Sequence, residues 1–594
     1  MVDGIRERPP HTLYEPPLTS VVASHSKLLS ISEMVARFPA RGTWLIVLCV
    51  SACGGEPRPS ADEPVSITVD ATRPQGPLQR IWPFFGYDEL NYTTTAEGAE
   101  LLATLVDSNT AQVQVRSHFL FNNGDGTPDL KWGSTNVYEE DDAGTPRYDW
   151  SLTDQILDTV TGAGALPFVE LGFMPEALSS RPSPYRNTSL TQLNGGCFYP
   201  PKDYGKWAKL VSTWAGHVDA RYVGVAANWR WELWNEPDSA YWHGTFEEYA
   251  KLYDFTEAAL HEALPEARLG GPAVVRADGE FFRQFLQHCV TGTNSVTGAV
   301  GTRLDHVTFH AKGGVAVVDG DVQLHLGNQL RLHRTGFATV ASFPELVRTP
   351  IYITEADPDG CAACPASLIA GAEYRLSPAY GAYEVAMMKR TLELQDDVGV
   401  ELAGILTWAF TFPNTPYFAG YRALSTNGID LPVLGAFKLL GKLEGDRLPL
   451  ESSGAQSLEE ILASSVRKSA DVDGLSAISG STIRVLVWNY HDTLVAAPSA
   501  PVRLRVQLPP ALGGKVLISH LRVDAEHGNA HARWRALGMP AAPSEAELAE
   551  LRLAMAPAKL LDEALTDVEA DGSVQVSFEL PRFGVSLVSI EPGD

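Results

Sequence analysis

The chain has 594 residues, too many for one compact core, so at least two domains are expected. It is 44% hydrophobic and 9% aromatic, as in ordinary globular proteins, and 46 basic against 72 acidic residues give a net charge of −26. This acidity excludes a nucleic-acid backbone as partner and disfavours a strongly anionic polymer as substrate, because phosphate binding needs a basic face. No run of about 20 apolar residues exists, so no transmembrane helix is expected.

Residues 1–53 have the layout of an export segment. Arg37 and Arg41 precede a short apolar run over residues 44–50, and small residues follow it. A basic start, an apolar middle and small residues before a cut are typical of a signal peptide. The chain is therefore predicted to be exported. A cytosolic protein with a poorly ordered N-terminal arm is the alternative.

Residues 50–53, Val-Ser-Ala-Cys, resemble a bacterial lipoprotein box. In such a box Cys53 is lipidated and becomes the new N-terminus, which would leave the protein anchored at the cell envelope; secretion is the other exported outcome. Met34 is then the expected start of translation, and residues 1–33 have no role in the mature protein. The Pro-rich polar residues 54–64 are expected to form a tether.

Residues 81–443 alternate short apolar runs with longer amphipathic ones. The predicted strands are 82–90, 111–121, 165–173, 225–234, 267–275, 304–312, 350–357 and 401–410. Eight strands alternating with helices indicate the α/β class and a (β/α)8 TIM barrel with insertions. A doubly wound open sheet is the alternative, but it would need a Gly-rich phosphate turn after its first strand, and the sequence has none there.

Residues 444–594 have a different sequence pattern from residues 81–443. Alternating strands bounded by Gly and Pro predict an all-β sandwich domain. One helical insert is expected over 544–561, because a Ser–x–x–Glu cap opens an apolar-periodic run. Residues 65–80, with a strand at 65–73, precede the barrel and are predicted to join the β domain.

Four cysteines remain outside the export segment: Cys197, Cys289, Cys361 and Cys364. Outside the cytosol they can pair as disulfides, with Cys361 and Cys364 as the nearest local pair, although each could also reach another partner. A zinc site needs four ligands at suitable spacing, and only one close pair exists. No metal is therefore expected.

Two carboxylates stand where barrel chemistry takes place, at the C-terminal ends of strands. Glu236 ends the fourth predicted strand and Glu355 ends the seventh. Glu170 and Glu232 instead lie within strands. Period-two alternation points Glu232 into the barrel, where Arg116 or an arginine of its own strand could pair with it. We interpret Glu170 and Glu232 as structural ion-pair members.

A pair of carboxylates at strand tips suits glycoside hydrolysis. One carboxylic acid protonates the departing sugar oxygen, and the other carboxylate attacks the anomeric carbon when the two lie about 5–5.5 Å apart; a wider gap leaves room for water and gives inversion. The acid needs a raised pKa, for which Trp231, Trp234 and Pro237 offer apolar surroundings near Glu236. Asn235 is an amide donor that could bind the sugar 2-hydroxyl.

The segments "WELWNEP" and "IYITEA" resemble the 4/7 superfamily of retaining glycosidases, clan A. The segments "LPFVELGFMPEAL", "FFGYDELNY", "HGNAHARWRALGMP" and "GIDLPVLGAFKLLGKL" resemble glycoside hydrolase family 39, which includes β-xylosidases, α-L-iduronidases and relatives acting on other polysaccharides. The resemblance covers residues 65–594. It implies a barrel plus β-sandwich, an oligo- or polysaccharide substrate, and no metal or organic cofactor.

The resemblance also implies roles for individual residues. Glu236 would be the acid/base, Glu355 the nucleophile, and Asn235 the partner of the 2-hydroxyl. The −1 subsite would be lined by His118, Phe173, His310 and Trp408. All four lie near C-terminal strand ends, and histidines and aromatics there suit the hydroxyls and C–H faces of sugars. The alternatives are scaffold roles for the histidines and plain core packing for the aromatics.

The sequence departs from the pattern of the family β-xylosidases in three places. Ala356-Asp357 replaces the Trp-Asn that usually follows the nucleophile, and Lys312 replaces a tyrosine two residues after the strand-six histidine. The loop 411–425 lacks the acidic pair that grips distal hydroxyls in those enzymes. Lys312 could meet the carboxylate of a uronic acid, but a solvated loop lysine is the favoured interpretation.

The predicted function is a retaining glycosidase of family 39 type, with a β-xylosidase-like exo-enzyme as the leading hypothesis. A family 39 enzyme acting on a uronic-acid glycoside or an exopolysaccharide is the first alternative. A non-catalytic carbohydrate-binding lipoprotein is the second. Contact with a membrane is predicted only through a lipidated Cys53, and no prediction follows for the oligomeric state.

Overall fold

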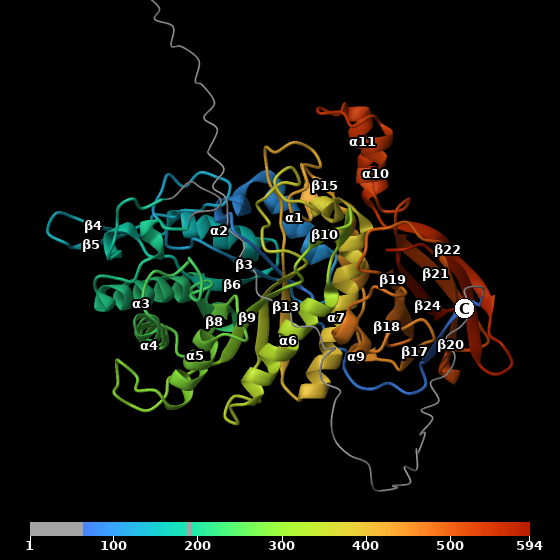
Figure 1. Cartoon of the computed structure of the whole chain (residues 1–594), viewed down its shortest axis with the longest axis horizontal. Helices are drawn as coiled ribbons and strands as arrows, with labels where there is room; N and C mark the ends of the chain where they lie inside the picture. Colours follow the sequence, from blue (N-terminus) through green and yellow to red (C-terminus); the bar gives the residue numbers. More distant parts are fainter. Residues whose placement is uncertain (1–62, 187–192, 594) are drawn as a thin grey trace, which may run out of the picture. The chain divides into compact units, whose positions relative to one another are not determined.

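The computed structural model describes residues 63–186 and 193–593 (Figure 1). The predicted export segment 1–53 lies outside the described residues, as does the predicted tether except for its last two positions. Within the described part of the chain, no helix is long and apolar enough to cross a membrane.

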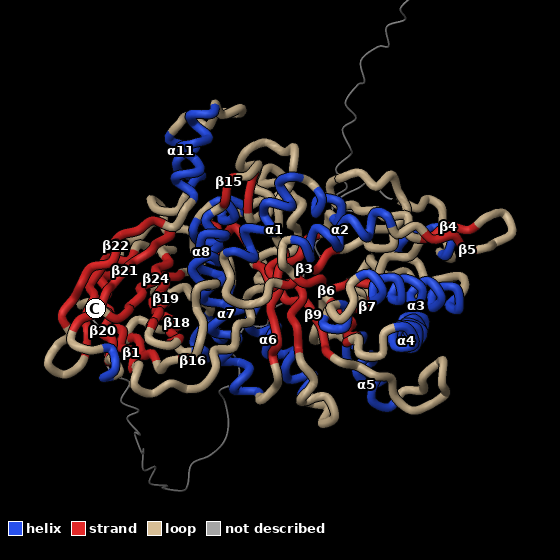
Figure 2. Tube along the Cα trace, turned by 180° about the vertical axis from the view of Figure 1, so that it is seen from behind, coloured by secondary structure: helices blue, strands red, loops and turns tan. Residues whose placement is uncertain are grey.

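A closed barrel of eight parallel strands forms the first part of the described chain (Figures 1 and 2). Its strands, in barrel order, are β2 (Phe84–Tyr87), β3 (Gln114–Ser117), β6 (Leu166–Leu171), β7 (Arg230–Leu233), β8 (Arg268–Val274), β9 (His306–Lys312), β12 (Ile351–Asp357) and β13 (Leu402–Trp408). The main helices of the barrel region are α1 (Ala96–Asp107), α2 (Ser151–Gly162), α3 (Tyr204–Arg221), α4 (Phe246–Ala263), α5 (Glu280–Thr291), α6 (Leu326–Ala341), α7 (Pro378–Val398) and α8 (Pro432–Leu440). The predicted (β/α)8 barrel of the α/β class is confirmed, because β13 pairs with β2 and closes the sheet.

Local sequence signals set the ends of the barrel helices. Helix α4 begins with a capping box, in which the Thr245 hydroxyl accepts from the Glu248 N–H and the Glu248 carboxylate accepts from the Thr245 N–H. Helix α7 begins with Ser377 as N-cap and proline at its first position. It ends at Gly399, whose φ of 77° is a left-handed conformation that glycine adopts without strain.

The interior of the barrel is layered along its axis. The floor is a small apolar cluster of Phe84, Phe168, Tyr352 and Leu406. Two residues further along the strands, period-two alternation brings Arg116, Glu170 and Glu232 to the interior. At this level Gly86 has no room for a side chain, since an added Cβ would lie 2.2 Å from the Trp408 ring. The charged layer therefore separates the apolar floor from the C-terminal mouth of the barrel.

Three small hairpins lie in the loops that follow the C-terminal ends of β3, β9 and β13. They are β4–β5 (Tyr138–Glu140, Pro146–Tyr148), β10–β11 (Ala316–Val318, Asp321–Gln323) and β14–β15 (Ser425–Thr426, Ile429–Asp430). Chemistry in such barrels is built from these loops, so the hairpins belong to the functional face.

The C-terminal part of the chain forms two packed antiparallel-rich sheets. One has the order β17-β1-β20-β23 and the other β16-β18-β19-β24-β21-β22. Their bounds are β1 (Val65–Asp70), β16 (Asp446–Arg447), β17 (Leu450–Ser452), β18 (Asp471–Ser479), β19 (Thr482–Tyr490), β20 (Ala500–Gln507), β21 (Lys515–Val523), β22 (Ala558–Asp567), β23 (Ser573–Leu580) and β24 (Val585–Pro592). Apolar side chains of both sheets, such as Ile67, Leu504, Val485 and Ile518, share one core, as in a sandwich. Strand β1 lies between β17 and β20.

The predicted helix over 544–561 is wrong at its C-terminal end. Helix α11 (Glu545–Met555) begins with the expected capping box of Ser544 and Glu547. It stops at Met555, because Pro557 cannot continue a helix and disfavours helical backbone in the residue before it. Residues from Ala558 onward pair with β21 as strand β22. The short helices α9 (Leu458–Ser464) and α10 (Ala530–Ala536) were not predicted.

Helix α7 joins the barrel to the β domain through buried charges. The Arg390 guanidinium lies 2.9 Å from Asp471 and 2.8 Å from Asp473, both on β18. Lys389 also pairs with Asp473. Removing one member of such a buried group leaves an uncompensated charge, so these ion pairs are expected to matter for stability.

Candidate active site

Glu236 stands in a strained turn immediately after β7. Trp234 and Glu236 have φ values of 68° and 45°, a left-handed region that residues with side chains rarely occupy. The Glu236 N–H donates to the Ala273 carbonyl at 3.0 Å, and the Trp234 indole N–H donates to the Tyr241 carbonyl at 2.8 Å. Asp238 holds the next loop by accepting from the N–H groups of residues 275 and 276, each at 2.9 Å. Backbone strain of this kind clusters at functional sites and is maintained by such surroundings.

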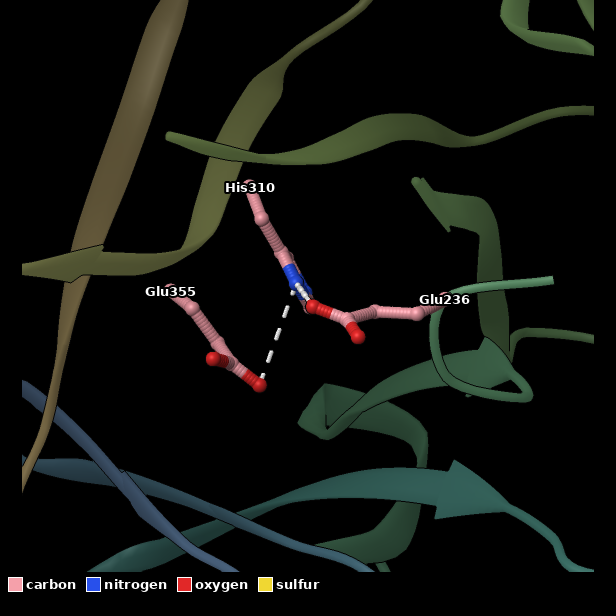
Figure 3. A group of neighbouring side chains, drawn as sticks. All are labelled: Glu236, His310 and Glu355. Atoms are coloured by element: carbon pink, nitrogen blue, oxygen red, sulfur yellow. Dashed lines mark hydrogen bonds and ion pairs between the residues drawn. The ribbon is translucent and has the colours of Figure 1, made fainter. Parts of the chain in front are cut away.

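Glu355, on β12, faces Glu236 across the mouth of the barrel (Figure 3). One ligand atom from each of Glu236, His310 and Glu355 lies within 4.8 Å of the other two. His310 bridges the carboxylates, with its Nδ1 2.9 Å from Glu236 Oε1 and 3.8 Å from Glu355 Oε1. One oxygen of each carboxyl group thus lies within 4.8 Å of the other, which agrees with the short carboxyl separation of retaining glycosidases.

Positive and potentially positive groups surround Glu355 on several sides. Lys312 Nζ lies 2.9 Å away, His118 Nε2 3.6 Å and Arg116 Nη1 3.8 Å. Burial opposes ionisation of this carboxyl, but Lys312, His310 and His118 together hold the pKa of Glu355 well below its usual range. The surrounding positive charge therefore favours the anionic form of Glu355, which is the form that a nucleophilic carboxylate needs.

The favoured interpretation of Lys312 as a solvated loop lysine is wrong. Its side chain is only 18% exposed, and its ammonium pairs with Glu355 at 2.9 Å and with Asp357 at 2.8 Å. Asp357 also accepts from the Tyr380 hydroxyl at 3.0 Å and from the Trp408 backbone N–H at 3.0 Å. Sequence reasoning failed here because Lys312 is the last residue of β9, and only the pairing of β9 with β12 places it opposite Asp357.

Arg116 organises the charged layer beneath the carboxylates. Its guanidinium lies 2.6 Å from Glu232 and 2.9 Å from Glu170, and all three side chains are fully buried. The interpretation of Glu170 and Glu232 as structural ion-pair members is confirmed. Arg116 also donates to Asn235 Oδ1 at 3.1 Å. Because arginine only donates, this bond orients the Asn235 amide with its oxygen inward and leaves its NH2 group as a donor.

His118 links Glu355 to two further acids. Its Nδ1 lies 2.6 Å from Glu170 and its Nε2 lies 3.2 Å from Asp88. Burial lowers the pKa of His118, but the Glu170 carboxylate outweighs it and raises the value to about 9. The imidazole is then a cation at neutral pH, held 3.6 Å from Glu355.

The two aromatic residues named from the sequence reach the site through His118. The Trp408 ring lies 4.5 Å from the His118 ring and under the Arg116 guanidinium at 5.1 Å. The Phe173 ring is fully buried, 5.9 Å from His118 and stacked on Tyr241 at 5.5 Å. Phe173 therefore supports the pocket from behind, and Tyr241 lies between it and the ammonium of Lys131.

Four residues at the site were not proposed from the sequence for this role: Asp88, Lys131, Tyr241 and Asp357. Asp88 follows β2 at a C-terminal strand end, so the barrel rule alone could have selected it. Asp357 appeared only as a departure from the family pattern. Lys131 and Tyr241 come from long loops, whose paths depend on tertiary contacts and carry no periodic signal.

The cysteines are divided between a disulfide and free thiols. Cys361 and Cys364 form a disulfide in the loop after β12, which realises the nearest-neighbour pairing. Cys197 and Cys289 are free and buried. The same loop is anchored by Asp359, which pairs with Arg375 at 2.7 Å and with Arg422 at 2.9 Å.

The residues of the site suit a sugar better than a metal ion. Glu236, His310 and Glu355 could in geometry hold a divalent cation. However, Lys312, Arg116 and His118 already supply positive charge around Glu355, and this charge opposes a further cation. The same charge leaves one ionised carboxylate facing a second, more exposed one, which is the arrangement needed for double displacement.

A closed (β/α)8 barrel with two near carboxylates at the ends of its fourth and seventh strands defines the class of retaining glycoside hydrolases. The family profile described as glycosyl hydrolases family 39 matches residues 65–575, and the chain belongs to this family. The protein is therefore a glycosidase.

Curated and solved relatives agree with the family. The chain is 26% identical over 503 residues to the "Beta-xylosidase" of Geobacillus stearothermophilus, covering 81% of this chain and 88% of the relative. It is also 26% identical over 576 residues to the "Alpha-L-iduronidase" of Canis lupus familiaris, covering 88% of this chain and 78% of the relative. The crystal structure of a monomeric beta-xylosidase from Caulobacter crescentus superposes with a TM-score of 0.70 at 23% identity, covering 89% of this chain and 100% of the other, which shows the shared fold.

Proposed function

We propose that the protein is a retaining exo-glycosidase of β-xylosidase type, with Glu355 as nucleophile and Glu236 as acid/base. The observation that carries the proposal is the convergence of these two carboxylates within 4.8 Å at the mouth of the barrel. The β-xylosidase relatives support the choice of sugar. Asn235, His118, Phe173, His310 and Trp408 are proposed as substrate-site residues.

In the first step Glu355 attacks the anomeric carbon and the bond from that carbon to the leaving-group oxygen breaks. Glu236 gives its proton to this oxygen, so the aglycone leaves as a neutral alcohol and a glycosyl ester forms on Glu355. His310, 2.9 Å from Glu236, orients the acid. Asn235 offers its NH2 group to the 2-hydroxyl, where hydrogen bonding strengthens in the transition state.

In the second step Glu236, now a carboxylate, takes a proton from water, and the water oxygen attacks the anomeric carbon. The ester bond breaks, Glu355 leaves as an anion, and the sugar is released with its original configuration. Lys312, His118 and Arg116 stabilise the returning charge on Glu355. The nucleophile is thereby a good leaving group, because the same cations that lower its pKa favour its departure.

A uronic-acid glycoside is the second candidate substrate, and Lys312 is the observation that favours it. The lysine lies at the nucleophile and is partly exposed, so a sugar carboxylate could meet it. The α-L-iduronidase relatives support this alternative. Against it, two carboxylates already balance the Lys312 charge, and a third would add repulsion. An exopolysaccharide is the remaining substrate alternative within the family.

A panel of aryl glycosides tests these proposals. Turnover of the β-xyloside with a higher kcat/KM than the β-glucuronide and α-L-iduronide supports the first proposal, and the reverse order supports the second. A non-catalytic sugar-binding protein would turn over none of them. Its carboxylate pair would then have no chemical use, which is why the geometry speaks against this reading.

We also propose that the chain is exported and anchored through Cys53. The lipoprotein-like box at residues 50–53 motivates this, and a disulfide between Cys361 and Cys364 suits an oxidising compartment. Intact-mass measurement on the native protein tests it: a mature chain beginning at a diacylated Cys53 is expected. A chain that retains residues 34–52 would contradict the proposal.

A further inference from the structure

Lys131 is held in an uncommon backbone conformation at the tip of the loop between β3 and β4. Its φ is 55°, in the left-handed region, although it carries a long side chain. The Lys131 N–H donates to Glu89 Oε1 at 2.8 Å. Ser134 exchanges two hydrogen bonds with the Asn91 side chain, at 2.9 and 3.0 Å. The loop is therefore fixed at Lys131 and at Ser134 to the segment that follows β2, and this maintained strain points to a function.

The Lys131 side chain extends toward the residues that surround Glu355. Its Nζ lies 2.5 Å from Asp88 Oδ2, and Asp88 Oδ1 lies 3.2 Å from His118 Nε2. His118 Nε2 in turn lies 3.6 Å from Glu355 Oε1. Two residues, Asp88 and His118, thus lie between the ammonium and Glu355. It also lies 5.7 Å from the centre of the Tyr241 ring, which closes the same side.

The Lys131–Asp88 pair is positioned for more than charge balance. Asp88 is 2% exposed and contacts both Lys131, at 2.5 Å, and His118, at 3.2 Å, so both of its oxygens are held in place. The Lys131 side chain is 20% exposed, and of the three N–H donors of its ammonium one goes to Asp88 and a second faces the Tyr241 hydroxyl. The third donor and the Asp88 oxygens can therefore serve a bound molecule.

The Asp88–Lys131 pair offers charged groups of the kind that the loop after β13 lacks. The loop 411–425 after β13 contains no Asp or Glu, so the acidic grip on distal sugar hydroxyls expected there is missing. A carboxylate next to an ammonium accepts from one hydroxyl and donates to its neighbour, which fits a vicinal diol. A sugar carboxylate would instead face the negative charge of Asp88.

We propose that Asp88 and Lys131 form a distal grip, which binds the glycone hydroxyls remote from the cleaved bond and selects a neutral pyranose. The proposal rests on the proposed glycosidase function and deepens it. Lys131 is then a substrate-contacting, specificity-determining residue.

Lys131→Met tests the distal grip on the preferred aryl glycoside and on its 3-deoxy and 4-deoxy counterparts. For the wild type, loss of the gripped hydroxyl is expected to lower kcat/KM about 10- to 100-fold, as for a hydrogen bond to a charged group. Lys131→Met should lower kcat/KM of the parent glycoside by a similar factor. Lys131→Met should change the kcat/KM of the matching deoxy glycoside less than about threefold, because the hydroxyl that Lys131 would bind is already absent from that substrate.

Lys438→Met is the matched control. Its Nζ lies 2.5 Å from Asp430, and its side chain is 22% exposed, so it resembles Lys131 in pairing and burial but lies outside the site. The kcat/KM of the Lys438→Met variant should equal that of the wild type for every substrate. Equal effects of Lys131→Met on the parent and both deoxy glycosides would overturn the grip, as would no effect at all.

Calorimetric titration with free monosaccharides separates this inference from the proposed function. If no aryl glycoside is turned over, the proposed function fails, but the grip still predicts that Lys131→Met weakens binding of the parent sugar more than of its deoxy form. Asp88→Asn supplies a second variant should Lys131→Met fold poorly. It should show the same substrate dependence, and a uniform loss across sugars would contradict the proposal.

Discussion

The ammonium of Lys312 should set the acid limit of activity. At 2.9 Å from Glu355 and an effective dielectric of about 20, its attraction is worth about 6 kcal/mol, or about 4 pKa units. Asp357 shares the ammonium at 2.8 Å, and Arg116 and His118 remain near Glu355 in the variant. We therefore expect Lys312→Met to raise the pKa of Glu355, by less than the full attraction because these groups compensate in part.

The sign of the effect follows from the ionised form being the active one. Glu355 has a depressed pKa in the native protein, so its carboxylate persists well below pH 4.5. Removal of a cation favours the protonated form, and the acidic limb of kcat/KM moves to higher pH. The assay is the pH profile of kcat/KM on an activated aryl glycoside, which reports the free enzyme. Activity should fall much more at pH 4–5 than near neutrality.

Two variants control this experiment. Lys312→Arg keeps the cation and should keep the acidic limb close to that of the wild type. Lys206→Met removes a lysine that pairs with Glu140 at 2.7 Å, away from Glu236 and Glu355. This variant should leave the pH profile of kcat/KM unchanged. An acidic limb that stays in place in Lys312→Met, or moves to lower pH, would refute the electrostatic role of Lys312.

Three further results are expected. Glu355→Ala should lower kcat at least about 10³-fold, with partial rescue by azide that yields a glycosyl azide of inverted configuration; full activity would refute the nucleophile assignment. Glu236→Ala should lower kcat/KM about 10²- to 10⁴-fold for poor leaving groups and far less for activated ones, whereas a uniform loss would speak against an acid role. Arg116→Met should lower the unfolding free energy by about 3–5 kcal/mol in denaturant titrations, because Glu170 and Glu232 would be left buried without their cation; unchanged stability would contradict that account.

The barrel and the proximity of Glu236 to Glu355 could be predicted because both depend on periodic signals. Eight apolar runs separated by amphipathic helices give the class, and the rule that chemistry lies at C-terminal strand ends selects Glu236 and Glu355. Alternation along the strand likewise assigned Glu232 to the interior. The helix over 544–561 was predicted too long because the strand pairing that takes over at Ala558 is a contact with β21, distant in sequence.

The surroundings of the carboxylates depend on contacts between residues far apart in the chain. Lys312 meets Glu355 only because β9 lies beside β12, and Lys131 meets Asp88 only because one loop is fastened to the segment after β2. A sequence pattern records which face of a strand a residue occupies, since that period is local. It does not record which other strand or loop lies opposite, and the pKa of Glu355 is governed by those opposite charges. The fold class and the placement of Glu236 and Glu355 at strand ends thus follow from local sequence patterns, whereas the charges around these carboxylates depend on which strands and loops the closed barrel brings together.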